Sequence, residues 1–209
     1  MKTMVQNGVR GALTLFVFAL VFTALMAGTY ALTKEIVASN EKRAKIALLA
    51  QVLPKGSFDN DILADAITQD AATLKQLNSE PGAQIFRARK NGQANAVVIE
   101  TVAPDGYSGK IKLLVGVAKD GAVLGVRVVA HKETPGLGDY IDAAKSDWIL
   151  GFDGKSLTQP EADRWKVKKD GGAFDSTAGA TISPRALVKA VKNTLEFVAA
   201  QQGALFGGQ

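Results

Sequence analysis

One long apolar run lies near the amino terminus. Residues 11–32, GALTLFVFALVFTALMAGTYAL, contain no charged side chain. As an α-helix these 22 residues would span roughly 33 Å, enough to cross a hydrocarbon core of about 30 Å. A cleaved signal peptide is the alternative, but its apolar region usually has only about 7–15 residues. We therefore predict a single retained transmembrane helix.

Two further stretches have helical patterns. Residues 34 to about 53 are expected to continue the first helix, and Pro54-Lys55-Gly56 would end it. Residues 59–77 predict another helix, because apolar side chains recur there at near-helical spacing. Pro81-Gly82 then breaks the pattern.

Four short runs rich in Val and Ile follow, at residues 84–89, 94–102, 110–117 and 123–131. The pairs Asn91-Gly92, Asp105-Gly106 and Asp120-Gly121 separate them, and these pairs are typical of tight hairpin turns. The pattern predicts an antiparallel sheet. Residues 134–154 mix glycines, acids and Trp148, and they give no clear pattern.

A last helix is predicted from about Pro184 to Gln201. Ser183 suits the N-cap and Pro184 the first helical position. Its apolar stripe consists of Leu187, Ala190, Val191, Leu195 and Val198. The soluble part is therefore expected to be one α+β domain, with a central antiparallel sheet and flanking helices.

Composition excludes several kinds of site. The 209 residues include no cysteine and one histidine, His131, which rules out disulfides, thiolate-held iron–sulfur clusters and multi-histidine zinc sites. A redox centre would have to be an organic cofactor or belong to a partner. The net charge of +5 is small and its charges are interspersed, so no nucleic-acid surface is expected. His131 is either structural or a proton-transfer group beside a cofactor.

The segment DSTAGATISP, residues 175–184, places Thr181 in a loop of small residues directly before the last helix. The low bulk of Ala178, Gly179 and Ala180 would let a large group approach the threonine hydroxyl. The start of the following helix offers unpaired N–H groups and a positive dipole end, which stabilise a phosphate. The alternative is a plain turn into a helix, because a three-residue motif is common by chance.

This segment resembles the flavinylation motif D-x-x-S-G-A-T of the FMN-binding domain family, with Ala178 in place of the usual serine. The run HKETPGLGD, residues 131–139, and Lys145-Ser146-Asp147-Trp148 after it look like the RnfG (RsxG) family of Rnf electron-transport complexes. The two motifs are in the family's order, and the resemblance covers essentially the whole chain.

The resemblance implies that Thr181 carries FMN covalently, through a phosphoester to the cofactor's phosphate. Asp175, Ala178, Gly179 and Ala180 would surround that phosphate. We further expect residues 131–139 to form a wall against the flavin ring, with contributions from four residues: Glu133, Thr134, Leu137 and Gly138. A separate flavin transferase would attach the FMN.

The function implied is an electron-carrying subunit of a membrane-bound, ferredoxin- and NAD-linked ion-translocating complex, rather than an enzyme with its own diffusible substrate. The partners implied are the other subunits of that complex. The NqrC protein of the sodium-pumping NADH:quinone reductase, which shares the flavin motif, is an alternative. A non-redox, membrane-anchored interaction module is another.

The expected organisation is a short tail at 1–10, a transmembrane helix at 11–32, a helical linker region at 33–82, an FMN-binding domain at 83–201 and a tail at 202–209. By resemblance, the soluble domain lies in the periplasm and the anchor in the bacterial inner membrane. The basic residues Lys2 and Arg10 on one flank, against Lys34, Lys42, Arg43 and Lys45 on the other, do not themselves favour a cytoplasmic amino terminus.

Overall fold

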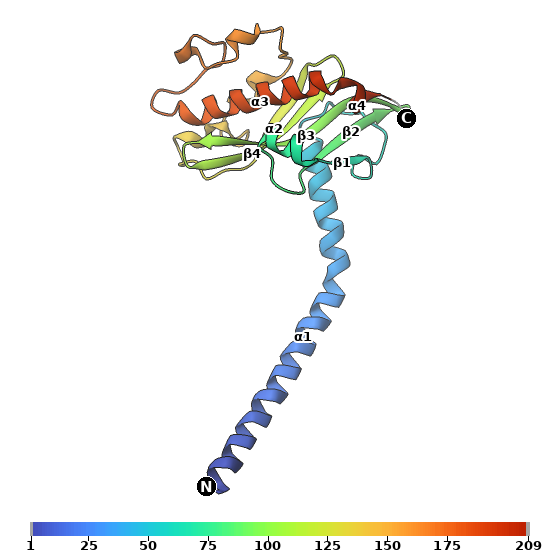
Figure 1. The fold of residues 1–209 in the computed structure, drawn as a ribbon, viewed down its shortest axis with the longest axis vertical. Coiled ribbons are helices and arrows are strands. Elements are labelled where there is room, and N and C mark those ends of the chain that lie inside the picture. The colour runs from blue at the N-terminus through green and yellow to red at the C-terminus, as the bar shows by residue number, and fades with distance from the viewer. Residues whose placement is uncertain (1, 208–209) are drawn as a thin grey trace. The chain divides into compact units, whose positions relative to one another are not determined.

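The computed structural model describes residues 2–207, and the chain divides into two compact units, residues 1–45 and 46–209 (Figure 1). The first unit is made by helix α1, Lys2–Leu49, whose last residues belong to the second unit. Among residues 2–207, α1 is the one helix that is long and apolar enough to cross a membrane.

The apolar part of α1 exposes its large side chains, as a helix in contact with lipid does. Leu15 is 72% exposed and Met26 71% exposed. The hydroxyl groups of Thr14 and Thr29 donate to the carbonyls four residues earlier, at 2.9 and 2.8 Å, which satisfies these polar groups without water.

The second unit is built on a five-stranded antiparallel sheet in the order β1-β2-β3-β4-β5. The strands are β1 Ala66–Thr68, β2 Gln84–Lys90, β3 Gln93–Gly106, β4 Gly109–Ala118 and β5 Val123–Ala130. The four strands predicted from the sequence are confirmed, and so is the α+β fold class. Asn91 and Gly92 both have positive φ, as a two-residue hairpin turn demands.

The second hairpin turn was misplaced by two residues. Asp105-Gly106 ends β3, and Gly106 pairs with Gly109, so that Tyr107 and Ser108 form the turn. A Cβ on Gly106 would lie 2.3 Å from the carbonyl oxygen of Gly109, so a glycine is needed there for the close approach of the two strands rather than for a positive φ.

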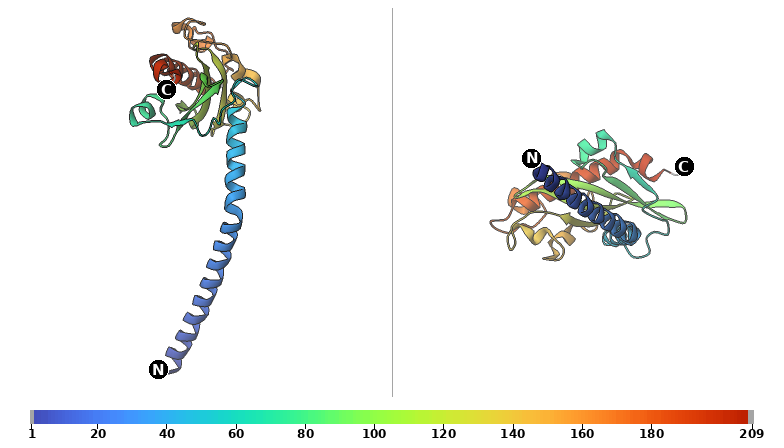
Figure 2. Two further views of the ribbon diagram at one scale, coloured as in Figure 1. Left: turned by 90° about the vertical axis from the view of Figure 1, so that its right-hand side faces the viewer. Right: turned by 90° about the horizontal axis from the view of Figure 1, so that it is seen from below.

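Helix α3, Ile182–Ala200, covers one face of the sheet (Figures 1 and 2). Its predicted stripe is buried throughout, and it packs into the main core with residues of β3, β4 and β5. The short helices α2, Ala71–Leu77, and α4, Gln202–Phe206, add Leu77, Leu205 and Phe206 to the same core.

A second, smaller core fills the other face of the sheet, where the end of α1 and the turn after it supply Leu49, Val52 and Leu53. The backbone of Val52 lies directly over two glycines that pair across β4 and β5, Gly116 and Gly125. A Cβ on Gly116 would lie 2.3 Å from the carbonyl oxygen of Val52, so this approach requires glycine.

The helix predicted for residues 59–77 is wrong over its first part. Residues 66–68 are β1, which pairs with β2, and only residues 71–77 are helical. Asp61 Oδ1 accepts hydrogen bonds from the N–H groups of Leu63 and Ala64, and Asn60 bonds to the backbone of β2. These bonds to Asn and Asp side chains compete with a helix.

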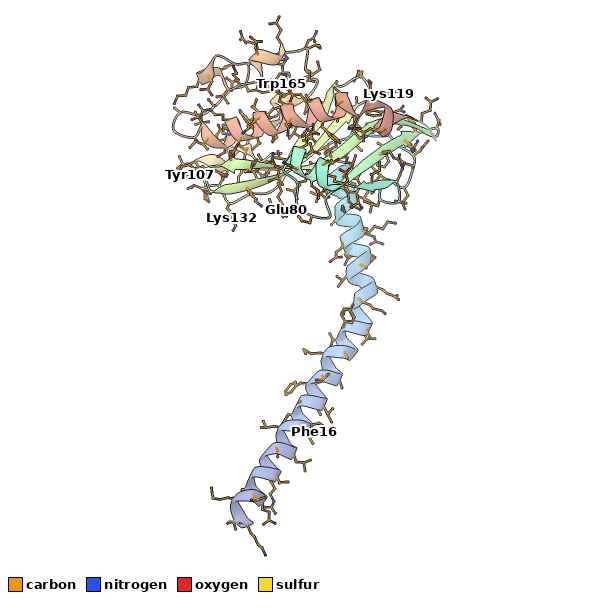
Figure 3. The ribbon with its side chains drawn as sticks, viewed as in Figure 1. Phe16, Glu80, Tyr107, Lys119, Lys132 and Trp165 are labelled. Atoms are coloured by element: carbon orange, nitrogen blue, oxygen red, sulfur yellow. The ribbon has the colours of Figure 1, made fainter. Side chains whose placement is uncertain are left out.

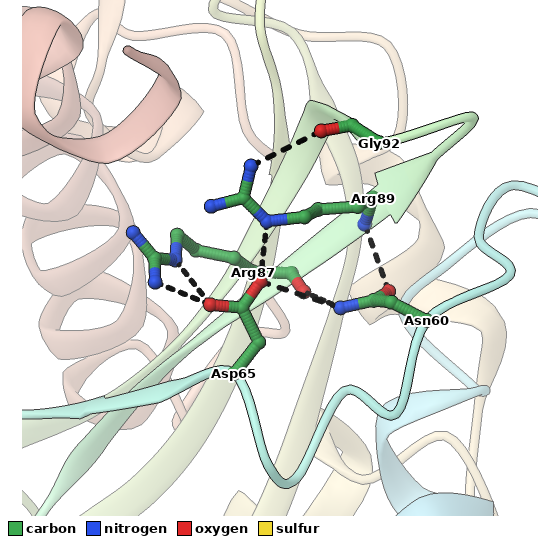
Figure 4. A network of polar contacts seen from close by, with 5 residues as sticks. All are labelled: Asn60, Asp65, Arg87, Arg89 and Gly92. Carbon is green, nitrogen blue, oxygen red and sulfur yellow. Dashed lines mark hydrogen bonds and ion pairs between the residues drawn. The ribbon is translucent and has the colours of Figure 1, made fainter. Parts of the chain in front are cut away.

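Asp65 anchors this segment to β2 through ion pairs with Arg87 and Arg89 (Figure 4). Arg89 Nε lies 2.5 Å from Asp65 Oδ2, and Asn60 donates to the carbonyl of Arg87 at 3.0 Å. Burial raises the pKa of Asp65, but the hydrogen bonds and positive charges of the two arginines lower it by more, so this pKa lies below its ordinary value.

Candidate functional site

Residues 175–181, which we call the acceptor loop, form a tight turn directly before α3. The N–H of Ala180 donates to the carbonyl of Thr177 at 3.1 Å, and Gly179 has φ of +83°. A positive φ at the third position of a four-residue turn selects glycine. The sequence STAGAT therefore turns at Gly179 and delivers Thr181 to the start of the helix.

Thr181 is half-buried and occupies the N-cap position of α3. Its carbonyl accepts the N–H of Arg185 at 3.2 Å, which begins the helical pattern. Within the described chain, its side chain makes no capping hydrogen bond. The hydroxyl therefore stands at the positive end of a 19-residue helix without a capping role.

Ser183 does not have the capping role predicted for it. The helix begins at Ile182, and the buried Ser183 hydroxyl donates to Glu133 Oε2 at 2.6 Å. Pro184 stands in the first turn, two residues later than predicted, where its missing N–H costs no helical hydrogen bond.

Glu133 is the centre of a buried contact that joins three segments. Its side chain is 4% exposed, and its Oε1 accepts the N–H of Ser108 in the β3–β4 turn at 3.1 Å. Gly138 lies against the same carboxylate, because a Cβ there would be 2.7 Å from Oε2. Both carboxylate oxygens are thus bonded by the protein itself.

The remainder of residues 131–139 forms a compact turn. The carbonyl of Thr134 accepts the N–H groups of Leu137 and Gly138, and Asp139 Oδ1 accepts that of Gly136 at 2.7 Å. The side chain of Thr134 is exposed, and Leu137 is 56% exposed. His131 Nδ1 accepts the N–H of Glu133 at 3.0 Å, which gives the single histidine a structural task in this turn.

Two aromatic residues that the sequence reasoning passed over hold the acceptor loop. The hydroxyl of Tyr140 accepts the N–H of Thr177 and donates to the carbonyl of Ala180, both at 3.1 Å. Trp148 Nε1 donates to the carbonyl of Asp175 at 2.7 Å. The available signal was the pair of aromatic residues in the stretch 134–154 that showed no regular pattern.

These residues lie on two short 3₁₀ helices, η1 Gly138–Ile141 and η2 Asp147–Phe152. The Tyr140 and Trp148 rings meet edge-to-face at 5.7 Å, and Trp148 meets Phe152 in the same way at 5.5 Å. Phe152 in turn packs with Trp165 and Phe174 (Trp165 is labelled in Figure 3). The acceptor loop is thereby tied to the main core.

The two sequence motifs therefore meet at the amino end of α3, through Glu133 with Ser183 and through Tyr140 with the acceptor loop. Three large side chains nearby are exposed: Tyr107 (70%; Figure 3), Leu137 (56%) and Ile182 (43%). Each is the chain neighbour of a residue that contacts Glu133. Asp175 is also exposed, and pairs with Lys168 at 2.6 Å. Across the described residues, no group of His, Asp and Glu is arranged to hold a metal ion.

Comparison with known proteins identifies the family. The sequence matches the RnfG N-terminal region over residues 1–52 and the FMN-binding domain over residues 106–196. A relative from Vibrio cholerae serotype O1, named as the G-type subunit of an ion-translocating oxidoreductase complex, is 49% identical over 196 residues, which are 94% of this chain and 92% of the relative. The chain belongs to the RnfG family.

Two further relatives with the same name agree with this assignment. One from Pseudomonas aeruginosa is 49% identical over 200 residues, covering 96% of this chain and 92% of the relative. One from Pseudoalteromonas atlantica is 46% identical over 197 residues, covering 94% and 91%. The match to the FMN-binding domain includes Glu133, Tyr140 and Thr181, whereas β1, β2 and most of β3 precede it in the same sheet.

Proposed function

We propose that this protein is the electron-carrying subunit of a membrane-bound ion-translocating oxidoreductase complex, and that it holds FMN through a phosphoester to Thr181. The observation that carries the proposal is the position of Thr181 in an FMN-binding domain. Its hydroxyl stands at the N-cap of α3, after a turn of small residues, and has no capping role.

The acceptor loop fits a phosphodiester. A single negative charge beside the first turn of α3 is stabilised by the helix dipole and by the N–H groups of that turn. Ala178 and Gly179 are exposed and small, so they leave room beside Thr181. Lys168 pairs with Asp175, which offsets the one acidic side chain of the loop.

Attachment needs an activated flavin donor, because joining Thr181 directly to FMN would require loss of water in an aqueous solution. A flavin dinucleotide, handled by a flavin transferase, supplies the activation. The Thr181 oxygen forms a bond to the flavin-side phosphorus and the phosphoanhydride bond breaks. The nucleoside monophosphate leaves with the bridging oxygen, and the threonine proton passes to solvent or to a base of the transferase.

The bound flavin would supply reversible electron transfer, while the protein supplies attachment and orientation. Leu137, Ile182 and Tyr107 are exposed apolar side chains suited to the faces of a planar ring. Gly138 and Glu133 support this wall from behind, since both are buried against Ser183. The exposed Thr134 hydroxyl is the polar group of the segment that faces solvent.

We place the anchor in a bacterial inner membrane with the domain in the periplasm, and we take the other subunits of the complex as partners. The match to the RnfG N-terminal region supports an RnfG protein over the NqrC protein of the sodium-pumping NADH:quinone reductase. Covalent attachment would retain the cofactor in a compartment where free FMN is scarce, because retention would no longer depend on its concentration.

The test is to coexpress the full chain with a flavin transferase and to examine it by in-gel fluorescence and intact mass. The wild-type chain should fluoresce on a denaturing gel, and Thr181→Ala should not. Thr177→Ala is the control, since Thr177 lies in the same loop. A fluorescent Thr181→Ala band would place the acceptor elsewhere, with Thr177 and Ser176 the nearest hydroxyls. A colourless wild-type chain would instead favour the non-redox interaction module.

A further inference from the structure

We infer that Tyr140 and Trp148 are positioning residues for flavin attachment, and that the Tyr140 hydroxyl holds the acceptor loop in the shape that presents Thr181 to the transferase. This inference rests on the proposed function. It adds two residues from a different part of the chain, 27 to 40 positions before the loop residues they bind.

The hydroxyl of Tyr140 completes a turn that the backbone leaves half closed. In a tight two-residue turn, the first and fourth residues can exchange two backbone hydrogen bonds. Here the Ala180 N–H to Thr177 carbonyl bond is direct. The opposite pair, the Thr177 N–H and the Ala180 carbonyl, is bridged by the Tyr140 oxygen, which accepts from one and donates to the other at 3.1 Å each.

Trp148 fixes the entry to the loop. Its indole N–H donates to the carbonyl of Asp175 at 2.7 Å, two residues before the turn begins. The two aromatic side chains therefore act on both ends of residues 175–180, and Thr181 follows immediately. Since the hydrogen bonds go to backbone atoms, the same hold would apply whatever side chain stands at residue 178.

The two side chains are themselves held by one serine and by ring packing. Ser146 Oγ donates to the Tyr140 carbonyl at 2.7 Å and accepts the Trp148 N–H at 3.2 Å. The rings are nearly perpendicular, at 86°, and Trp148 continues to Phe152, which is fully buried. The positions of the Tyr140 oxygen and the Trp148 nitrogen are thus set by the core and not by the loop.

A group-transfer step depends steeply on such positioning. Displacing a reacting atom by about 1 Å costs about a hundred-fold in rate, and the acceptor oxygen is attached to the residue directly after the loop. Tyr140→Phe keeps the ring and its packing but removes both hydrogen bonds. We expect flavin attachment to this variant to be about ten-fold to a hundred-fold slower than to wild type.

The first measurement is the rate of flavin attachment to the full chain in detergent, with purified transferase and a flavin dinucleotide. The matched control is Thr101→Val, which removes one buried hydroxyl bond, from Thr101 to the Leu77 carbonyl at 2.8 Å, away from the loop. Trp148→Phe should also slow attachment. Its control, Trp165→Phe, loses a similar bond to Ser156 in the same aromatic cluster.

The second measurement needs no flavin. Hydrogen exchange of the unloaded full chain should show the Thr177 amide exchanging about ten-fold faster in Tyr140→Phe, because its acceptor is gone. Exchange at this amide in Thr101→Val should match wild type.

Each outcome decides the matter. Wild-type attachment rates in Tyr140→Phe would overturn the inference, and so would equal slowing in Thr101→Val, which would indicate a general loss of stability. Normal attachment with an altered flavin spectrum would mean that Tyr140 acts on the bound ring instead. If wild type takes up no flavin, the proposed function fails, and the amide exchange alone decides whether Tyr140 holds the loop.

Discussion

Glu133 shows how one buried side chain can assemble a site from distant segments. It accepts hydrogen bonds from Ser183, 50 residues later, and from Ser108, 25 residues earlier. Replacing one carboxylate oxygen by an amide group turns a donor toward one of these donors. We therefore expect Glu133→Gln to lower the free energy of unfolding by about 1–3 kcal/mol, measured by denaturant titration of the full chain in detergent.

A double-mutant cycle with Ser183→Ala separates the contact from the rest of the change. If the bond is formed as described, the two substitutions together should cost less than the sum of their separate effects, by about 1 kcal/mol. Glu161→Gln is the control, because Glu161 is exposed and its side chain makes no capping bond in the described structure. Additive effects, or no loss in Glu133→Gln, would contradict the role given to Glu133.

At the same scale, the sequence pointed to the right segments but not to each residue's task. Glu133 was expected at the polar edge of the flavin, whereas the structure bonds both of its oxygens to protein. Tyr140 was missed entirely, since its task depends on contacts with residues about 40 positions away. No local pattern encodes such partners, because they exist only once the sheet and α3 have brought the segments together.

Elements were predictable where one periodicity ruled. The strands alternate or run apolar between turn pairs, and the stripe of α3 recurs at helical spacing, so both followed from the sequence. Residues 59–65 misled because their spacing is helical while Asn60 and Asp61 bond backbone N–H and C=O groups instead. Residues 138–170 form four 3₁₀ helices held by aromatic packing, for which no periodicity exists to be read.

The seam between the second core and the sheet makes a prediction about elements. Val52 packs over Gly116 and Gly125, and a Cβ on Gly116 would lie 2.3 Å from the Val52 carbonyl oxygen. Gly116→Ala should therefore force the turn after α1 away from the sheet, and lower the free energy of unfolding by about 1–3 kcal/mol.

Thermal unfolding of the full chain followed by circular dichroism would measure this loss. Gly203→Ala in α4 is the control, since no heavy atom of the described chain lies within 4 Å of the added Cβ and alanine favours a helix. A Gly116→Ala chain as stable as wild type would show that this seam yields easily.

On the scale of the whole molecule, the chain joins one membrane-spanning helix to one folded unit that carries the candidate site. The unit begins at Ile46, and the segment expected to be a helical linker contributes β1 to its sheet. The end of α1 thus belongs to the second core through Leu49. An electron carrier built this way stays at the membrane surface, where the other subunits of its complex are found.

The side of the membrane is the prediction that charge alone left open, because basic residues flank the apolar run on both ends. We expect the amino terminus in the cytoplasm and the folded unit in the periplasm. The chain has no cysteine, so one introduced thiol reports one position. In spheroplasts, a membrane-impermeant maleimide should label Lys119→Cys, an exposed turn residue (Figure 3), and label Lys2→Cys only after lysis. Protease added to the same spheroplasts should digest the unit. Labelling of Lys2→Cys in unlysed spheroplasts, with Lys119→Cys protected, would reverse the orientation and place the flavin site in the cytoplasm.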